Sequence, residues 1–264
     1  MSVLDEIIDS KLDEVAALRA RETALLDAAR AAGPPRDFAA ALRRPDGTVA
    51  VIAECKRRSP SKGDLAPDLD PVAAAVAYEA GGAAALSVLT DAPYFGGSLA
   101  DLEAARDACS IPVLRKDFTI DPLQIVEARG AGADAVLLIV AAIPDDALLA
   151  DLHTVALEWG LAVLVEAHTE DEIDRALRAG ARIVGVNSRD LSTFAEDLSV
   201  AQRLATRIPG DVVGVAESAI RSRDDAARMA AAGFDAVLVG EALVRSADPG
   251  ALVSEMTKSL VVKA

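Results

Sequence analysis

The sequence predicts an α/β protein that folds as a (β/α)8 TIM barrel with an extra N-terminal helix. Three observations lead to this prediction: eight short apolar runs rich in β-branched residues, a helix-length segment between successive runs, and glycines that end several of those segments. Helix-length connections between successive strands indicate that the strands are parallel, because a tight hairpin joins only antiparallel strands. Eight strand–helix units are the number needed to close the sheet into a barrel. A doubly wound open sheet is the alternative, although no GxGxxG motif follows the first predicted strand.

The N-terminal segment is predicted to form one amphipathic helix over about 3–32. Leu4, Ile7 and Leu18 fall at helical spacing on its apolar side, and charged residues fill the other face. A Gly-Pro-Pro sequence at 33–35 ends this helix. A short irregular link then leads into the barrel.

The barrel strands are predicted at regular intervals along the rest of the chain. Glycines such as Gly180 and Gly233 precede a strand and would supply the left-handed ends of the intervening helices. We therefore expect a single barrel domain over 1–264, of which 1–47 is an N-terminal helical extension. The predicted strands are 49–54, 84–90, 112–118, 135–140, 162–168, 183–187, 212–217 and 236–240.

The composition argues against several classes of function. Lys and Arg total 27 against 42 Asp and Glu, and a net charge of −15 disfavours nucleic acid or an anionic membrane as a partner. The acidic N-terminus does not resemble a signal peptide, and no apolar run is long enough to cross a bilayer. Cys55 and Cys109 make neither a disulfide framework nor a zinc site. We expect a cytoplasmic protein with a small anionic ligand; a monomer is compatible with the sequence.

Polar side chains gather where the predicted strands end, which is where barrels carry their chemistry. Alternation along a strand puts Glu54 and Lys56 on one face. A single charge at a strand end is more often a solvated or salt-bridged residue, and we keep this interpretation for Arg57 and Lys62. His168 is expected to be a loop or supporting residue. Several charged or polar side chains are predicted to point to the same rim of the barrel, and burying so many charges requires that they be paired or serve a function. These residues are Glu54, Lys56, Lys116, Glu166, Asn187, Arg189 and Glu217.

A phosphate site is predicted after the last two strands. Ser218 and Ala219 follow the seventh strand, while Gly240 and Glu241 lie between the eighth strand and a helix. Free backbone N–H groups at such a position in a barrel bind anions. Glu241 would repel a phosphate unless its side chain turns away or a lysine offsets its charge.

Six segments together resemble one known family, that of indole-3-glycerol phosphate synthase. The resemblance covers nearly the whole chain and includes the N-terminal helix. One departure is Ala219, where the family usually has glycine; alanine tolerates positive φ poorly, so the phosphate site is expected to be slightly altered. The segments are ECKRRSPSKG at 54–63, LTDAPYFGGS at 89–98, LRKDF at 114–118, LVEAH at 164–168, VNSRDL at 186–191 and AES at 216–218.

This resemblance implies a ring closure in tryptophan biosynthesis that uses neither cofactor nor metal. The substrate 1-(2-carboxyphenylamino)-1-deoxyribulose 5-phosphate would become indole-3-glycerol phosphate, with loss of CO2 and water. General acid–base catalysis would come from Lys116 toward the keto oxygen and Glu166 as base, with Lys56 or Lys116 as the acid of dehydration and Glu54 holding Lys56. The implied substrate-binding residues are Asn187, Arg189, Glu217 and Ser59, with Leu114, Phe118, Leu137 and Leu238 as an apolar wall.

Two other functions remain open at this point. An aldolase-like barrel would use Lys116 as a Schiff-base nucleophile, which needs a lowered lysine pKa. A non-catalytic sensor of phosphorylated ligands would need the phosphate site but not the acids and bases.

Overall fold

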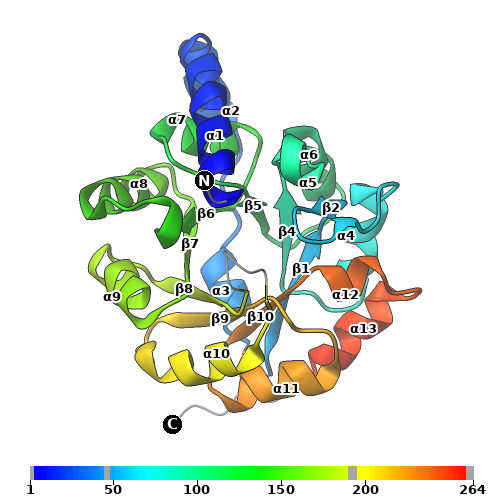
Figure 1. Cartoon of the computed structure of the whole chain (residues 1–264). Helices are drawn as coiled ribbons and strands as arrows, with labels where there is room; N and C mark the ends of the chain where they lie inside the picture. The colour runs from blue at the N-terminus through cyan, green and yellow to red at the C-terminus, as the bar shows by residue number, and fades with distance from the viewer. Residues whose placement is uncertain (1–2, 45–47, 190–194, 260–264) are drawn as a thin grey trace.

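The barrel prediction is confirmed by the computed structural model, which describes residues 3–44, 48–189 and 195–259. Eight parallel strands form a closed ring in which the last strand pairs with the first, so the open-sheet alternative is wrong (Figure 1). Each strand begins and ends within two residues of its predicted bounds. In chain order the barrel strands are β1 (Ala50–Cys55), β4 (Ala85–Leu89), β5 (Val113–Lys116), β6 (Ala135–Ile139), β7 (Ala162–Ala167), β8 (Ile183–Asn187), β9 (Val213–Glu217) and β10 (Ala236–Val239).

One main helix follows each barrel strand and packs outside the ring. The predicted left-handed helix ends are present, because Gly180 and Gly233 have φ values of 93° and 101°. Short additional pieces are α5 (Ala92–Phe95), α12 (Glu241–Val244) and the 3-10 turns Val140–Ala142 and Ala205–Arg207. The main helices are α4 (Pro71–Ala80), α6 (Leu99–Asp107), α7 (Pro122–Gly130), α8 (Asp146–Glu158), α9 (Glu170–Arg178), α10 (Leu198–Leu204), α11 (Arg223–Ala231) and α13 (Pro249–Met256).

Strand alternation divides the apolar core into two parts. Along β1, Val51, Ala53 and Cys55 pack in the cluster between strands and helices, while Ala50 and Ile52 belong to the cluster inside the barrel. All six residues of β1 are buried. The same alternation turns the polar residue at the end of each strand either toward the barrel axis or toward the helices.

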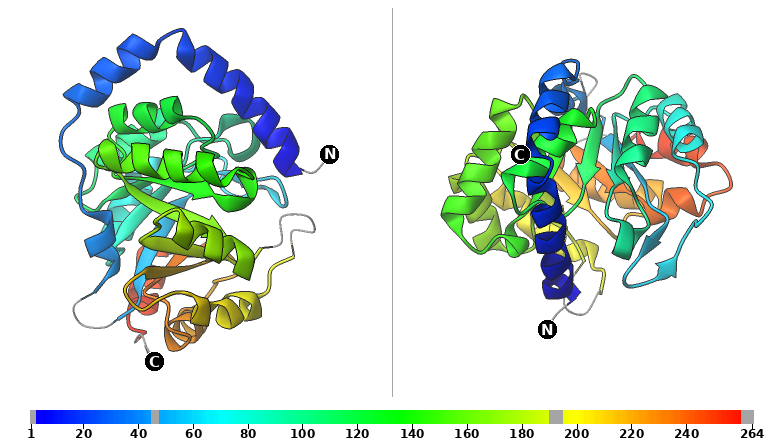
Figure 2. Two further views of the ribbon diagram at one scale, coloured as in Figure 1. Left: turned by 90° about the vertical axis from the view of Figure 1, so that its left-hand side faces the viewer. Right: turned by 90° about the horizontal axis from the view of Figure 1, so that it is seen from above.

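The N-terminal extension contains two helices where the sequence predicted one. α1 (Val3–Arg19) and α2 (Glu22–Ala31) meet at Arg21, whose φ of −124° and ψ of 20° are not helical. Figure 2 shows the two helices at an angle, with α1 running over the barrel. Leu18 and Leu25, on either side of the break, share a cluster with residues of α7. A straight helix could not follow α7 and also cross the barrel end, so tertiary packing decides the break.

The third helix of the extension closes the opposite end of the barrel. α3 (Phe38–Leu42) contributes two fully buried side chains, Phe38 and Leu42, to the cluster inside the barrel. This cluster includes Ala50 and Ile183, which begin their strands. Among the described residues, α3 covers the amino ends of the strands, and the carboxyl ends are left open to a ligand.

The loop after β1 contains a feature that the sequence did not predict. Its residues form a small antiparallel pair, β2 (Arg58–Ser59) with β3 (Gly63–Asp64). Arg57, at the start of this loop, pairs with Asp101 of α6 at 2.6 Å. The loop is thus tied to the barrel from its base, and Arg57 is a salt-bridged residue as expected.

Candidate active site

A cavity at the carboxyl ends of the strands brings together the residues that the sequence assigned to the site, except one. Leu114 is the exception within the expected apolar wall, because it is fully buried inside the barrel and does not line the cavity. In the segment at 186–191, Asp190 and Leu191 lie outside the described residues. The expected residues that line the cavity are Glu54, Lys56, Ser59, Lys116, Phe118, Leu137, Glu166, Asn187, Arg189, Glu217, Ser218, Ala219, Leu238, Gly240 and Glu241.

Lys116 lies at the centre of the charged groups in this cavity. It ends β5, and its Nζ is 2.8 Å from Oε2 of Glu166 on β7 and 3.5 Å from Oε2 of Glu217 on β9. The other Glu166 oxygen accepts a hydrogen bond of 2.9 Å from Nδ2 of Asn187. Four strands, β5, β7, β8 and β9, therefore direct an ammonium, two carboxyl groups and an amide at one point.

The surrounding charges determine which of these groups carry protons. Burial alone would lower the pKa of Lys116, but Glu166, Glu217 and Glu54 outweigh burial and raise it above its ordinary value. Burial would raise the pKa of Glu166, yet Lys116 and His168 hold it below its usual range. Burial and the charge of Glu166 raise the pKa of Glu217 despite Lys116. A charged lysine thus faces one ionised and one protonated carboxyl group, which disfavours the Schiff-base alternative.

Lys56 and Glu54 form a second acid–base pair beside the first. Lys56 Nζ is 2.6 Å from Oε1 of Glu54, so the shared face predicted for these two residues of β1 and its loop is confirmed. The Ser87 hydroxyl lies 3.4 Å from Oε2 of Glu54. Gly240 makes room for the pair, because a Cβ there would come within 2.4 Å of Glu54 Oε1 and 3.1 Å of Lys56 Nζ.

Arg189 also lines the cavity, and its charge is partly neutralised. Its guanidinium donates a hydrogen bond of 2.6 Å to the Ser61 hydroxyl and pairs with Glu196. Arg221 contacts the same carboxylate at 2.6 Å. Two guanidinium groups share one carboxylate, so one positive charge remains for an anionic ligand. Sequence reasoning did not single out Ser61, Glu196 or Arg221.

The loop after β9 has an unusual backbone at the predicted phosphate site. Ser218 and Ala219 have φ values of 65° and 61°, and among the described residues they are the non-glycine positions with positive φ. Such strain costs about 1–3 kcal/mol per residue and concentrates at ligand sites. The charge of Glu241 is offset, as expected, by a lysine: Lys62 Nζ is 2.6 Å from its Oε2.

Replacement of Ala219 by glycine should relieve this strain. Glycine adopts positive φ freely, so Ala219→Gly is expected to raise the free energy of unfolding by about 0.5–1 kcal/mol despite the more flexible unfolded chain. Denaturant titration measures the change. Ala242→Gly is a matched control in the helical residues of α12, where the same replacement should destabilise by about 1 kcal/mol. Equal losses in both variants would contradict the strain argument.

The N-terminal helix supplies a wall of the cavity that sequence reasoning missed. Val3, Leu4 and Ile7 of α1 line it, together with Phe95 of α5 and Phe118. The Phe95 and Phe118 rings have centroids 6.1 Å apart. These apolar side chains lie beside the charged groups, which is the composition expected of a pocket for an aromatic ligand.

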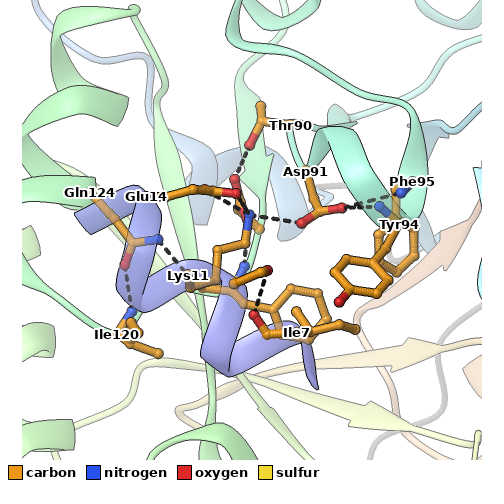
Figure 3. Close-up of polar contacts among 12 residues, drawn as sticks. Ile7, Lys11, Glu14, Thr90, Asp91, Tyr94, Phe95, Ile120 and Gln124 are labelled. Carbon is orange, nitrogen blue, oxygen red and sulfur yellow. Dashed lines mark hydrogen bonds and ion pairs between the residues drawn. The ribbon is translucent and has the colours of Figure 1, made fainter. Parts of the chain in front are cut away.

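Lys11 fixes α1 in this position. Its fully buried Nζ lies 2.8 Å from Asp91 Oδ2, 2.9 Å from Asp117 Oδ1 and 3.0 Å from Glu14 (Figure 3). Asp91 caps α5 through the backbone N–H groups of Tyr94 and Phe95, and Asp117 directly follows Lys116. One sequence signal could have indicated this role: Lys11 interrupts the apolar stripe of the helix that contains Ile7.

The described residues contain neither a metal-binding cluster nor a candidate membrane span. No group of three or more His, Cys, Asp or Glu residues there is arranged to hold a metal ion. In the same part of the chain, no helix combines the length and apolar character that a membrane span requires.

Comparison with known proteins identifies the family. The sequence profile described as "Indole-3-glycerol phosphate synthase" matches residues 4–256. A protein of that name from Mycobacterium ulcerans is 52% identical over 97% of this chain and 93% of its own length. Another from Leifsonia xyli is 53% identical over 97% and 98%.

The similarity to one solved structure, at low sequence identity, shows the fold alone. Thiamine phosphate pyrophosphorylase from Pyrococcus furiosus superposes with a TM-score of 0.57 at 18% identity, covering 79% of this chain and 94% of that one. The sequence matches span nearly the whole barrel and its extension. The chain therefore belongs to the indole-3-glycerol phosphate synthase family of decarboxylating lyases, which act in tryptophan biosynthesis.

Proposed function

We propose that Lys116 and Glu166 close the indole ring of 1-(2-carboxyphenylamino)-1-deoxyribulose 5-phosphate by acid–base catalysis. The observation that supports this most directly is the placement of Lys116 Nζ 2.8 Å from a carboxyl oxygen of Glu166 in a cavity with apolar walls. The arrangement holds an acid and a base within reach of one small substrate.

Ring closure is the step assigned to Lys116. The ring carbon that bears the carboxylate attacks the keto carbon, and the keto oxygen becomes a hydroxyl group by taking a proton from Lys116. A charged lysine stabilises the negative charge that develops on this oxygen. Once Lys116 has given up its proton, the chief cause of the low Glu166 pKa is gone, and Glu166 becomes a stronger base.

Decarboxylation and dehydration complete the reaction. The bond to the carboxylate breaks, CO2 leaves, and the electron pair restores the aromatic ring. Glu166 then takes a proton from the carbon next to the new hydroxyl-bearing centre. The hydroxyl leaves as water with a proton from Lys56 or Lys116, and a carbon–carbon double bond completes the indole.

The remaining residues would bind the substrate at its two anionic ends. Arg189, with its shared carboxylate partner, suits the carboxylate of the anthranilate part, and Asn187 lies beside it. Glu217 would orient a hydroxyl of the ribulose chain. At the other end, the backbone of Ser218, Ala219 and Gly240 would bind the phosphate. Ser59 lines the same cavity and would also contact the substrate.

A direct assay tests the proposal. The purified chain, given the anilino-ribulose phosphate, should produce the indole fluorescence of the product, and excess EDTA should leave the rate unchanged because side chains supply every proton. Lys116→Met from the same preparation procedure controls for contaminating activity. Saturable binding of the substrate without any product would instead support the sensor function.

A further inference from the structure

His168 is bracketed by two carboxylates. It directly follows β7, and its Nε2 is 3.5 Å from Oε1 of Glu166, while its Nδ1 is 3.2 Å from Oε2 of Glu172 in α9. Glu172 is itself fixed, because its Oε2 accepts the His168 backbone N–H at 2.6 Å and its own N–H donates to the Thr169 side chain. The His168 side chain is 12% exposed.

These contacts determine the protonation state of the ring. A neutral imidazole has one N–H, so it can donate to only one of the two carboxylates, and its other nitrogen would direct a lone pair at the second. Both carboxylates face an N–H only when the ring is an imidazolium. Nε2 is buried and has no hydrogen-bond partner among the described residues, so Glu166 is the group it faces.

We propose that His168 is a positioning residue for the ring closure: as an imidazolium anchored by Glu172, it keeps Glu166 ionised and turned toward Lys116. This inference deepens the proposed function and rests on the role of Glu166 as base. The link from Glu172 through His168 and Glu166 to Lys116 connects the start of α9 to the acid of the first step.

The charges around the ring favour its cationic form. Burial lowers the pKa of His168 and Lys116 opposes a second positive charge, but Glu172 and Glu166 outweigh both and raise the pKa above its ordinary 6.5. His168 is therefore cationic below this raised value and loses its charge above it. Its stabilising contribution is fully present below pH 6.5 and is lost as pH rises through the folded-state pKa.

Histidine NMR titration tests the contact without turnover. The chain has two histidines, and His153→Gln assigns the signals while serving as a matched control. His153 is buried in α8 and burial lowers its pKa. We expect His168 to titrate above 6.5, and its pKa to fall in both Glu172→Gln and Glu166→Gln. A His168 pKa at or below 6.5 in the wild type would overturn the inference.

Kinetics test the functional consequence. His168→Gln keeps an N–H donor but removes the charge, and it should lower kcat at pH 7 by about 10-fold with KM changed less than about 2-fold. Wild-type kcat should decline as pH rises through the His168 pKa, and the variant should lack this decline. His153→Gln should match the wild type throughout.

The outcomes separate this inference from the proposed function. Wild-type kcat in His168→Gln across the pH range would overturn the positioning role. Full turnover by Glu166→Gln would overturn the base role and this inference with it. An inactive Glu166→Gln in which His168 titrates as in the wild type would overturn the inference alone.

Discussion

Lys116→Met should lower kcat by about 10⁴-fold, with only a modest rise in KM. Methionine matches the length of the lysine side chain but removes the ammonium, so the keto oxygen loses both its proton donor and its electrostatic stabilisation. Steady-state fluorescence assays measure the change. Lys258→Met, which removes an exposed lysine just after α13, should behave like the wild type.

Borohydride trapping distinguishes an acid role of Lys116 from a nucleophilic one. Both mechanisms lose activity without Lys116, but only a Schiff base would be trapped by borohydride in the wild-type enzyme. We expect no covalent adduct, because three nearby carboxyl groups raise the Lys116 pKa and keep its amine protonated. A trapped adduct at Lys116 would contradict the acid role, and so would unchanged turnover of Lys116→Met.

The features that the sequence predicted correctly depend on short, periodic patterns. Side chains two residues apart in a strand share a face, so Glu54 and Lys56 could be paired from their spacing alone, and the structure places their charges 2.6 Å apart. The carboxyl ends of the strands meet at one rim in any parallel barrel. The sequence therefore predicts that Lys116 and Glu166 lie close together although fifty residues separate them.

The features that the sequence did not predict depend on contacts between distant segments. Apolar spacing continues from α1 into α2, so the pattern contains no signal for the break at Arg21, which follows from packing on α7. Lys11 stands out by interrupting an apolar stripe, but its partners Asp91 and Asp117 are distant in the sequence and only the structure identifies them. The side chain of Leu114 points into the barrel, as the strand alternation predicts, but it is buried below the cavity and does not line it.

Glu166→Gln should stall the reaction after decarboxylation. Glutamine has the same shape and can still contact Asn187 and Lys116, but it cannot accept the proton that leaves carbon during dehydration. In a single-turnover experiment with a labelled substrate carboxylate, CO2 should be released while the indole fluorescence rises about 10²–10⁴-fold more slowly. Glu170→Gln, in the exposed first turn of α9, should show both events at the wild-type rate. A normal fluorescence rise would contradict the base role.

The stability of this variant provides a second, independent measure of the ionised carboxylate. The folded-state pKa of Glu166 lies below its ordinary 4.5, so the ionised group stabilises the wild type above that pH, and this contribution is lost as pH falls through the folded-state pKa. Glutamine cannot supply it. The difference in thermal midpoint between wild type and Glu166→Gln should therefore be largest near neutral pH and shrink on acidification. A difference that does not depend on pH would mean that Glu166 is not held ionised by Lys116 and His168.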